Sequence, residues 1–265
     1  MTVSVLRWAG SKRQILPALA KYWRGHARYV EPFVGSATLF FHLSPSRAIL
    51  GDINKDLINA LRQIKRDHEG VFLSLRSTRK SERDYYRIRS EFNSGADQKK
   101  RAAQFIYLNR FCFNGLYRTN EAGEFNVPYG AFKSGRLPTK RQLLDCANAL
   151  QKARLLAGDF EKTLSRTKRG DFVYLDPPYQ VGGTRVFSEY DASVFTVNDL
   201  QRLRAALLTL KKIGASFLLS YIDSAEGRSL SRGFNVESVT VRRCISGFVG
   251  SRSVGRELLI SWSAA

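Results

Sequence analysis

A short apolar run that ends in Asp176-Pro177-Pro178-Tyr179 constrains the fold of this chain more than any other feature. The run, Phe172 to Leu175, has the length and composition of a buried strand and places a carboxylate at its carboxyl end. Ligands bind at this edge of an open α/β sheet, and the two prolines end the strand and remove two backbone donors. The acceptors that remain, the Asp176 carboxylate and the proline carbonyls, suit the amino group of a nucleobase, and the ring of Tyr179 offers a face for the planar base. The simpler alternative is a Pro-rich turn with a surface acid.

A glycine turn follows another expected strand. The chain from Tyr29 to Val34 runs into Gly35 and Ser36, and a helix is expected from Thr38 to Leu43. Because such a unit brings backbone amides close to a ligand, we expect a small molecule over Gly35. A short strand from Ala48 to Asp52 then ends in an acid, where acids commonly bind ribose hydroxyls. The alternatives are an ordinary tight turn at Gly35 and a helix cap at Asp52.

The middle of the chain has a different pattern. From Lys55 to about Leu150 apolar residues recur at helical spacing, interrupted by loops near 114–115 and 130–138. After Phe160 strand patterns return at 172–175, 217–221, 236–241 and 258–262, and a helix from Val197 to Leu210 is capped by Thr196. The sequence predicts an α/β fold in which residues 1–55 and 150–265 form a sheet flanked by helices, and residues 56–149 form a helical insertion.

The charge of the chain indicates a nucleic-acid partner. Its 265 residues include 43 Lys and Arg against 23 Asp and Glu, a formal net charge of +20, which is typical of proteins that bind a phosphate backbone. Charge alone does not separate DNA from RNA. The basic residues concentrate at 76–89, 99–101, 166–169 and 242–256, which favours a folded binding surface over a basic tail.

Neither a metal nor a membrane is expected. The cysteines, Cys112, Cys146 and Cys244, have no metal-ligand spacing, and we expect them to be reduced and buried. The chain has no apolar run of about eighteen residues and no apolar signal segment at its start, so we expect it to be cytoplasmic.

Six motifs in a fixed order carry a family resemblance. They are Arg7-Trp8-Ala9-Gly10-Ser11-Lys12, Glu31-Pro32-Phe33-Val34-Gly35-Ser36, Gly51-Asp52-Ile53-Asn54, Asn114-Gly115-Leu116-Tyr117-Arg118, Gly123-Glu124-Phe125-Asn126-Val127-Pro128 and Asp176-Pro177-Pro178-Tyr179. Together they resemble the Dam-type (D12 class) adenine-N6 DNA methyltransferases over nearly the whole chain. The resemblance implies a Rossmann-like S-adenosylmethionine-dependent methyltransferase sheet with a helical target-recognition insertion that binds double-stranded DNA.

The resemblance also implies which residues bind the cofactor. The positions that match the family's S-adenosylmethionine site are Trp8, Lys12, Gly35, Ser36, Asp52, Asp159, Phe160 and Asp176. Without the resemblance, Trp8 would be interpreted as a core aromatic and Lys12 as a solvated charge.

The catalytic residues implied are Asp176, Pro177, Pro178 and Tyr179. Asp176 and the Pro177 carbonyl would accept the two hydrogens of the adenine amino group. These hydrogen bonds would localise the lone pair of the amino nitrogen for in-line attack on the sulfonium methyl group. The amine is inaccessible inside a duplex, so the base must flip out, and Tyr179 would stack on it. Residues 182–195 resemble a loop that closes over the flipped base.

The positions that match the family's DNA-reading residues are Arg7, Phe113, Asn114, Leu116, Arg118 and Pro128. Arg118 would contact guanine O6 and N7, or alternatively a phosphate. GATC is the implied target, although Arg7 and Phe113 stand where lysine and tyrosine are common, and Ala37 replaces a glycine. A cytosine-N4 or RNA amino-methyltransferase and a noncatalytic DNA binder are the alternatives.

Overall fold

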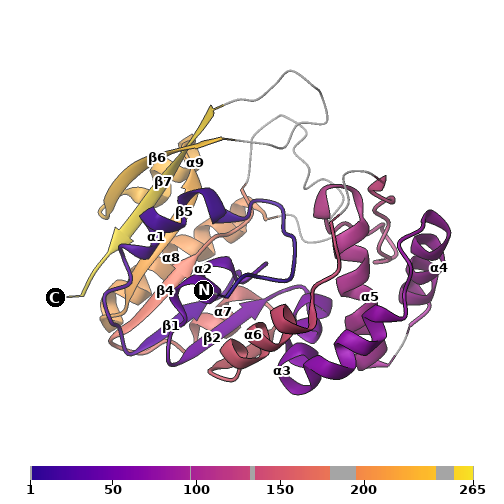
Figure 1. The fold of residues 1–265 in the computed structure, drawn as a ribbon. Helices are drawn as coiled ribbons and strands as arrows, with labels where there is room; N and C mark the ends of the chain where they lie inside the picture. Colours follow the sequence, from indigo (N-terminus) through magenta and orange to yellow (C-terminus); the bar gives the residue numbers. More distant parts are fainter. Residues whose placement is uncertain (1, 96, 132–134, 180–194, 243–253, 265) are drawn as a thin grey trace.

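The structure, a computed structural model, describes residues 2–95, 97–131, 135–179, 195–242 and 254–264. Among these residues a seven-stranded sheet has the order β3-β2-β1-β4-β5-β7-β6 (Figure 1). Its strands are β1 (Arg28–Glu31), β2 (Ala48–Asp52), β3 (Ala153–Ala157), β4 (Asp171–Leu175), β5 (Ser216–Ile222), β6 (Asn235–Arg242) and β7 (Val254–Trp262). The first five pair in parallel, and β7 is antiparallel to both of its neighbours. This arrangement confirms the expected Rossmann-like α/β sheet.

Helices cover both faces of the sheet. They are α1 (Leu16–Ala20), α2 (Thr38–Leu43), α3 (Lys55–Arg76), α4 (Glu82–Asn93), α5 (Gln98–Phe111), α6 (Lys140–Leu150), α7 (Phe160–Leu164), α8 (Val197–Ile213) and α9 (Ala225–Ser231), with 3₁₀ turns at Lys12–Ile15 and Phe113–Gly115. The α8 helix begins at Thr196 as expected, because Thr196 and Asp199 form a capping box.

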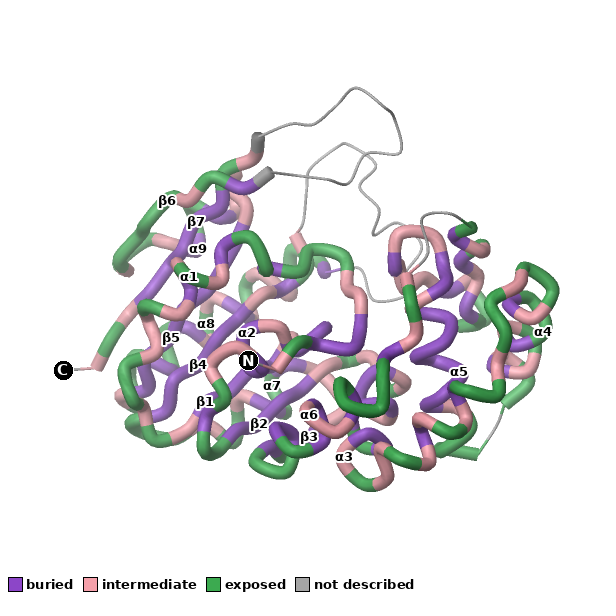
Figure 2. Tube along the Cα trace, viewed as in Figure 1, coloured by how far each residue is buried: buried purple, intermediate pink, exposed green. Residues whose placement is uncertain are grey.

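The sheet is buried on both faces because its strands alternate between two cores. Tyr29 and Phe172 belong to the core under α1, α2 and α3, whereas their neighbours Val30 and Val173 belong to the core under α8 and α9. This alternation follows from the period of two along a strand. The buried strands therefore form the middle layer of three (Figure 2).

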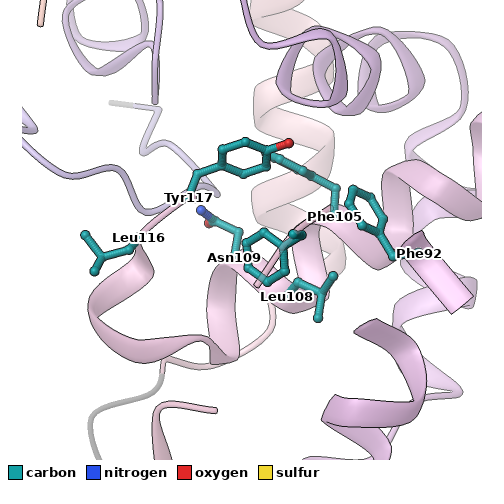
Figure 3. Close-up of a pocket in the computed structure, with 7 residues that line it drawn as sticks. Phe92, Phe105, Leu108, Asn109, Leu116 and Tyr117 are labelled. Atoms are coloured by element: carbon teal, nitrogen blue, oxygen red, sulfur yellow. The ribbon is translucent and has the colours of Figure 1, made fainter. Parts of the chain in front are cut away.

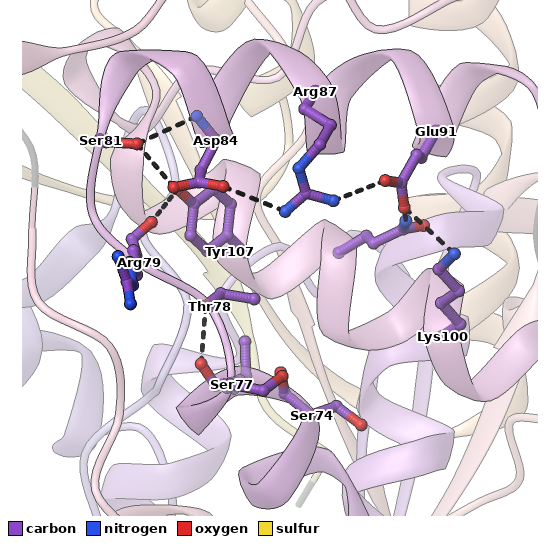
Figure 4. Close-up of polar contacts among 12 residues, drawn as sticks. Ser74, Ser77, Thr78, Arg79, Ser81, Asp84, Arg87, Glu91, Lys100 and Tyr107 are labelled. Atoms are coloured by element: carbon purple, nitrogen blue, oxygen red, sulfur yellow. Dashed lines mark hydrogen bonds and ion pairs between the residues drawn. The ribbon is translucent and has the colours of Figure 1, made fainter.

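The helices α3 to α6 lie beside one edge of the sheet (Figure 1). Arg87 of α4 pairs with Asp84 and Glu91 at 3.2 and 2.6 Å, and Lys100 of α5 pairs with Glu91 at 3.1 Å (Figure 4). These helices share one continuous core with the sheet, because buried Phe92 belongs to the same cluster as Tyr29. The division at 55 and 150 therefore stays a prediction.

Two details differ from the sequence analysis. Strand patterns were expected to return only after Phe160, but β3 begins at Ala153. It is an edge strand that pairs only with β2 and exposes Arg154, so its pattern is weak. The cap of α3 is Asn54, whose side chain accepts from the amides of Asp56 and Leu57, and Asp52 is not its cap. As expected, the two described cysteines, Cys112 and Cys146, are buried and unpaired, whereas Cys244 lies outside the described residues.

Candidate active site

The carboxyl ends of β1, β2 and β4 place three acids, Glu31, Asp52 and Asp176, at one edge of the sheet, which we call the carboxyl edge. Asp176 follows β4 directly, as its motif predicts. Its Oδ1 accepts from Lys12 Nζ at 2.8 Å and from Ser220 Oγ at 3.0 Å. Within the described chain, Oδ2 has no hydrogen-bond partner. The carboxylate is thus held by one oxygen and presents the other.

Lys12 is the centre of a buried polar cluster. Its ammonium donates to Tyr179 Oη at 2.8 Å and lies 3.7 Å from Glu257 Oε1, and Tyr179 Oη donates to the same Glu257 oxygen at 3.2 Å. Only 8% of the Lys12 side chain is exposed. Lys12 is therefore not a solvated charge, and it joins the Asp176 motif to β7.

The charges within this cluster control its protonation. Burial lowers the pKa of Lys12, but electrostatic interactions with Asp176, Tyr179 and Glu257 outweigh burial and raise that pKa well above its ordinary value. Burial and the charge of Asp176 raise the pKa of Tyr179 as well. At neutral pH Lys12 is therefore a cation and Tyr179 a neutral donor.

The glycine turn lies next to Asp52 and Trp8. Gly35 has φ +45°, and its amide donates to Asp52 Oδ2 at 3.0 Å. A Cβ at Gly35 would lie 2.8 Å from Trp8 Cδ1, so only glycine leaves room for the indole ring. Buried Ser36 bonds to Thr38 at 2.8 Å. The following residue, Ala37, has φ +53°, which explains why a glycine suits that position.

Glu31 is an acid to which the sequence analysis assigned no role. Its side chain is buried, and Oε2 has no hydrogen-bond partner among the described residues. Burial, with the negative charges of Asp176 and Asp52, raises the pKa of Glu31 well above its ordinary value. Glu31 therefore shares the carboxyl edge with Asp52 and Asp176. An orphaned acceptor beside the turn fits a ligand with hydroxyl or ammonium donors, such as S-adenosylmethionine.

Asp159 and Phe160 follow β3 and lie beside Asp52, because the Gly158 amide donates to the Asp52 carbonyl at 2.9 Å. The Asp159 side chain caps α7 and pairs with Arg202 at 2.6 Å. Phe160 is buried and stacks on Phe33 at 5.3 Å. Their contact with a cofactor stays a prediction. Residues 180–194, which include most of the expected closing loop, lie outside the described residues.

The expected DNA-reading residues gather in one loop, residues 112–130, apart from Arg7. The Phe113 amide donates to the Pro128 carbonyl at 2.9 Å, and Asn114 has φ +54°. Arg118 donates to the Asn126 side chain at 2.7 Å and to its carbonyl at 3.3 Å. Leu116 is half-buried.

Arg7 reaches the same loop from the other end of the chain. Its backbone exchanges two hydrogen bonds with the Asn109 side chain, at 2.8 and 2.6 Å. A Cβ at Gly115 would lie 2.7 Å from Arg7 Cβ, so the two segments are in close contact. The structure thus brings Arg7 into contact with the loop that carries the other five residues of the expected DNA-reading set.

The loop lies on an apolar pocket. Figure 3 shows Tyr117 and Leu116 of the loop beside Phe105 and Asn109 of α5, which line this pocket together with Phe92, Leu108 and Phe125. Tyr117 also stacks on Trp8, with ring centroids 6.2 Å apart and an interplanar angle of 20°. The indole ring that touches Gly35 therefore also supports loop 112–130.

Comparison with known proteins decides the family. The description of the D12 class N6 adenine-specific DNA methyltransferases matches residues 8–245. The chain belongs to this family. It is therefore an adenine-specific DNA methyltransferase, and DNA is its substrate.

Curated relatives match along nearly their full length. The Type II methyltransferase M1.LlaDCHI of Lactococcus lactis subsp. cremoris is 34% identical, over 96% of this chain and 93% of its own. The Type II methyltransferase M.MjaIII of Methanocaldococcus jannaschii is 36% identical, over 96% and 97%. The DNA adenine methylase of Vibrio cholerae is 34% identical, over 96% and 94%.

The sequence analysis missed three contacts of this site: Ser220, Asn126 and Glu257. Ser220 is fully buried in β5, and Glu257 is buried in β7. An acid directly before the apolar run 258–260 was the one available signal for Glu257, because buried charges need partners. Separately, no helix within the described ranges has the length and apolar character needed to span a bilayer.

Proposed function

We propose that this methyltransferase transfers a methyl group from S-adenosylmethionine to N6 of an adenine flipped out of duplex DNA, within GATC or a related site. One observation carries the proposal. Both donors to Asp176 among the described residues, Lys12 and Ser220, end on Oδ1, which leaves Oδ2 to accept from a substrate. A carboxylate oxygen beside the Pro177 carbonyl can accept the hydrogens of one planar amino group.

The residues of the chain supply positioning and electrostatics. Lys12 fixes the Asp176 carboxylate as an acceptor, and an amino group held there is oriented for attack along one line. Gly35, Asp52 and Glu31 would hold S-adenosylmethionine, which supplies the electrophilic methyl group. Tyr179 stacks edge-to-face on Tyr221 at 5.1 Å, so its ring is held in place for contact with a flipped base.

A graded pair of variants tests the role of Asp176. Asp176→Asn keeps the size of the side chain but replaces an acceptor with a donor, so single-turnover methylation should fall by several orders of magnitude. Ser220→Ala removes only one support of Oδ1 and should cost about ten-fold, equivalent to about 1.4 kcal/mol. Product nucleosides are identified by mass spectrometry. Near-parental rates for Asp176→Asn would contradict the proposed site.

A second pair tests the target sequence. If Arg118 contacts a guanine edge, Arg118→Ala should cost about 1 to 3 kcal/mol on GATC and relax preference at one position. Arg118→Lys keeps the positive charge but loses the planar, two-pronged guanidinium. If Arg118 contacts a guanine, methylation by Arg118→Lys should fall as it does in Arg118→Ala. If Arg118 contacts a phosphate, Arg118→Lys should methylate DNA as the parent does. Methylation is measured on GATC and every single-base variant at two salt concentrations. Absence of any GATC preference in the parent would refute the proposed target.

A further inference from the structure

At the amino ends of the strands, opposite the carboxyl edge, the surface has a hollow of about 730 Å³. It lies among the starts of β1, β2 and β3, the loop before β4, and α3. Seven basic residues line it: Arg28, Arg47, Lys65, Lys152, Arg154, Arg166 and Lys168. Its lining includes no acidic residue. We call this feature the basic hollow.

Two of these cations are used within the fold. Arg28 pairs with Asp171 at 2.6 Å, and Lys65 donates to the Ala153 carbonyl at 2.8 Å. The other five are exposed, and within the described residues none of them pairs with a carboxylate. They are Arg47, Lys152, Arg154, Arg166 and Lys168. The basic hollow therefore keeps an uncompensated positive charge.

The basic concentration at 99–101 does not keep an uncompensated charge. Lys99 pairs with Asp67, Lys100 with Glu91, and the guanidinium of Arg101 with Asp56. That segment was expected to contribute to a binding surface, but its charge serves packing between helices. By contrast, Arg166 and Lys168 of the concentration at 166–169 line the basic hollow, so part of the net positive charge of the chain lies there.

We propose that the basic hollow binds the phosphates of a second segment of double-stranded DNA, separate from the segment that enters the methylation site. The cations are long, exposed and contributed by several elements, which suits a polyanion better than a single small anion. The net charge and the DNA substrate of this family identify the polyanion.

The position of the basic hollow requires a second segment. The strands β1, β2 and β4 separate it from the carboxyl edge, and the five residues of β4 extend about 16 Å. DNA is stiff over about 150 base pairs, so a straight duplex seated at the carboxyl edge does not turn around the sheet to its opposite end. Two duplexes, or two distant parts of a long one, can each occupy one end.

A bridging experiment tests this inference. A 20-base-pair duplex is immobilised on beads, full-length protein is added, and capture of a fluorescent second duplex is measured from 50 to 200 mM salt. The test variant is Arg47→Gln/Lys152→Gln/Lys168→Gln. The control is Lys21→Gln/Lys212→Gln/Arg232→Gln, which removes the same charge from exposed residues that pair with no carboxylate in the described chain.

The parent and the control should capture the second duplex, and the test variant should capture it at least ten-fold less. The slope of log affinity against log salt should fall by about 2.7, since about 0.9 counterions are released per phosphate contact. Methylation of a short duplex should be unchanged in both variants, which separates this inference from the proposed function. Equal capture by the two variants would overturn it. The inference would also be overturned if the parent captured phosphatidylserine vesicles but no second duplex, and the test variant lost that capture of vesicles.

Discussion

Removal of the Lys12 ammonium is the sharpest perturbation of the active site. Lys12→Met keeps the length of the side chain but leaves Asp176 and Glu257 without their shared cation, which lies 2.8 and 3.7 Å from their oxygens. Removal of one partner from a buried ion pair costs about 3 to 5 kcal/mol, because the remaining charge is buried and uncompensated. Asp176 is 21% exposed and keeps its bond from Ser220, so we expect the lower end, about 3 kcal/mol.

The loss should depend on pH in a definite direction. The raised pKa of Lys12 means that its pairing is fully present below its ordinary value near 10.5 and is lost only above it, so the parent keeps the pairing throughout pH 5.5 to 8. In the variant, Asp176 and Glu257 take up protons more readily because their cation is gone. The deficit in free energy of unfolding should therefore be larger at pH 8 than at pH 5.5.

Urea unfolding at both pH values measures this effect. Lys65→Met is the matched control, since Lys65 donates to a backbone carbonyl and not to a carboxylate, and it should cost about 1 kcal/mol with little pH dependence. Glu257→Gln, added to Lys12→Met, should recover about 1 kcal/mol by removing one unpaired charge. A loss below 1 kcal/mol for Lys12→Met, or an equal loss at both pH values, would refute the reasoning.

Two further variants probe the neighbouring groups. Because the pKa of Glu31 is raised, the free energy of unfolding of the parent should fall as pH rises from about 4.5 through that pKa, by up to about 1.4 kcal/mol per pH unit. Glu31→Gln should remove this dependence and be the more stable protein at pH 8 in urea unfolding. Parallel pH profiles for the two proteins would contradict the raised pKa of Glu31. Gly35→Ala should abolish S-adenosylmethionine binding in titration calorimetry, because the added Cβ strains the backbone at positive φ and clashes with Trp8. Gly25→Ala is the control: Gly25 has φ +72° but open space around it, so this variant should lose only about 1 to 2 kcal/mol of stability. Unchanged affinity for Gly35→Ala would show that the glycine turn is not part of the site.

Local sequence patterns were sufficient for the fold where each element carries its own signal. The strand before Asp176 is a continuous apolar run that two prolines follow, and α8 has a capping residue and a glycine at its end, so both were predicted within a few residues. The edge strand β3 was not found because only two of its five residues are buried, and its short pattern resembles the end of the preceding helix.

The candidate site was predictable only in part, because its supports come from distant strands. Asp176 and Lys12 are visible as motifs, but their contact joins residues 164 positions apart in the chain and depends on the sheet order. Ser220 and Glu257 enter the cluster because β5 lies beside β4 and β7 lies beside β5. A serine or an acid in a strand gives no local indication of the neighbour it will contact.

Trp8 connects the two halves of this enzyme. Its indole ring leaves room for no side chain at Gly35 and stacks on Tyr117, which lies between Leu116 and Arg118 in loop 112–130. The Tyr117 hydroxyl donates to Asp56 at 3.3 Å, in the first turn of the helix that follows β2. Because these contacts join the loop to the glycine turn through side chains and not along the backbone, a shift of the turn requires Trp8 or Tyr117 to repack. Loop 112–130 and the glycine turn therefore share one support, and the position of Arg118 depends on the same ring that borders the glycine turn.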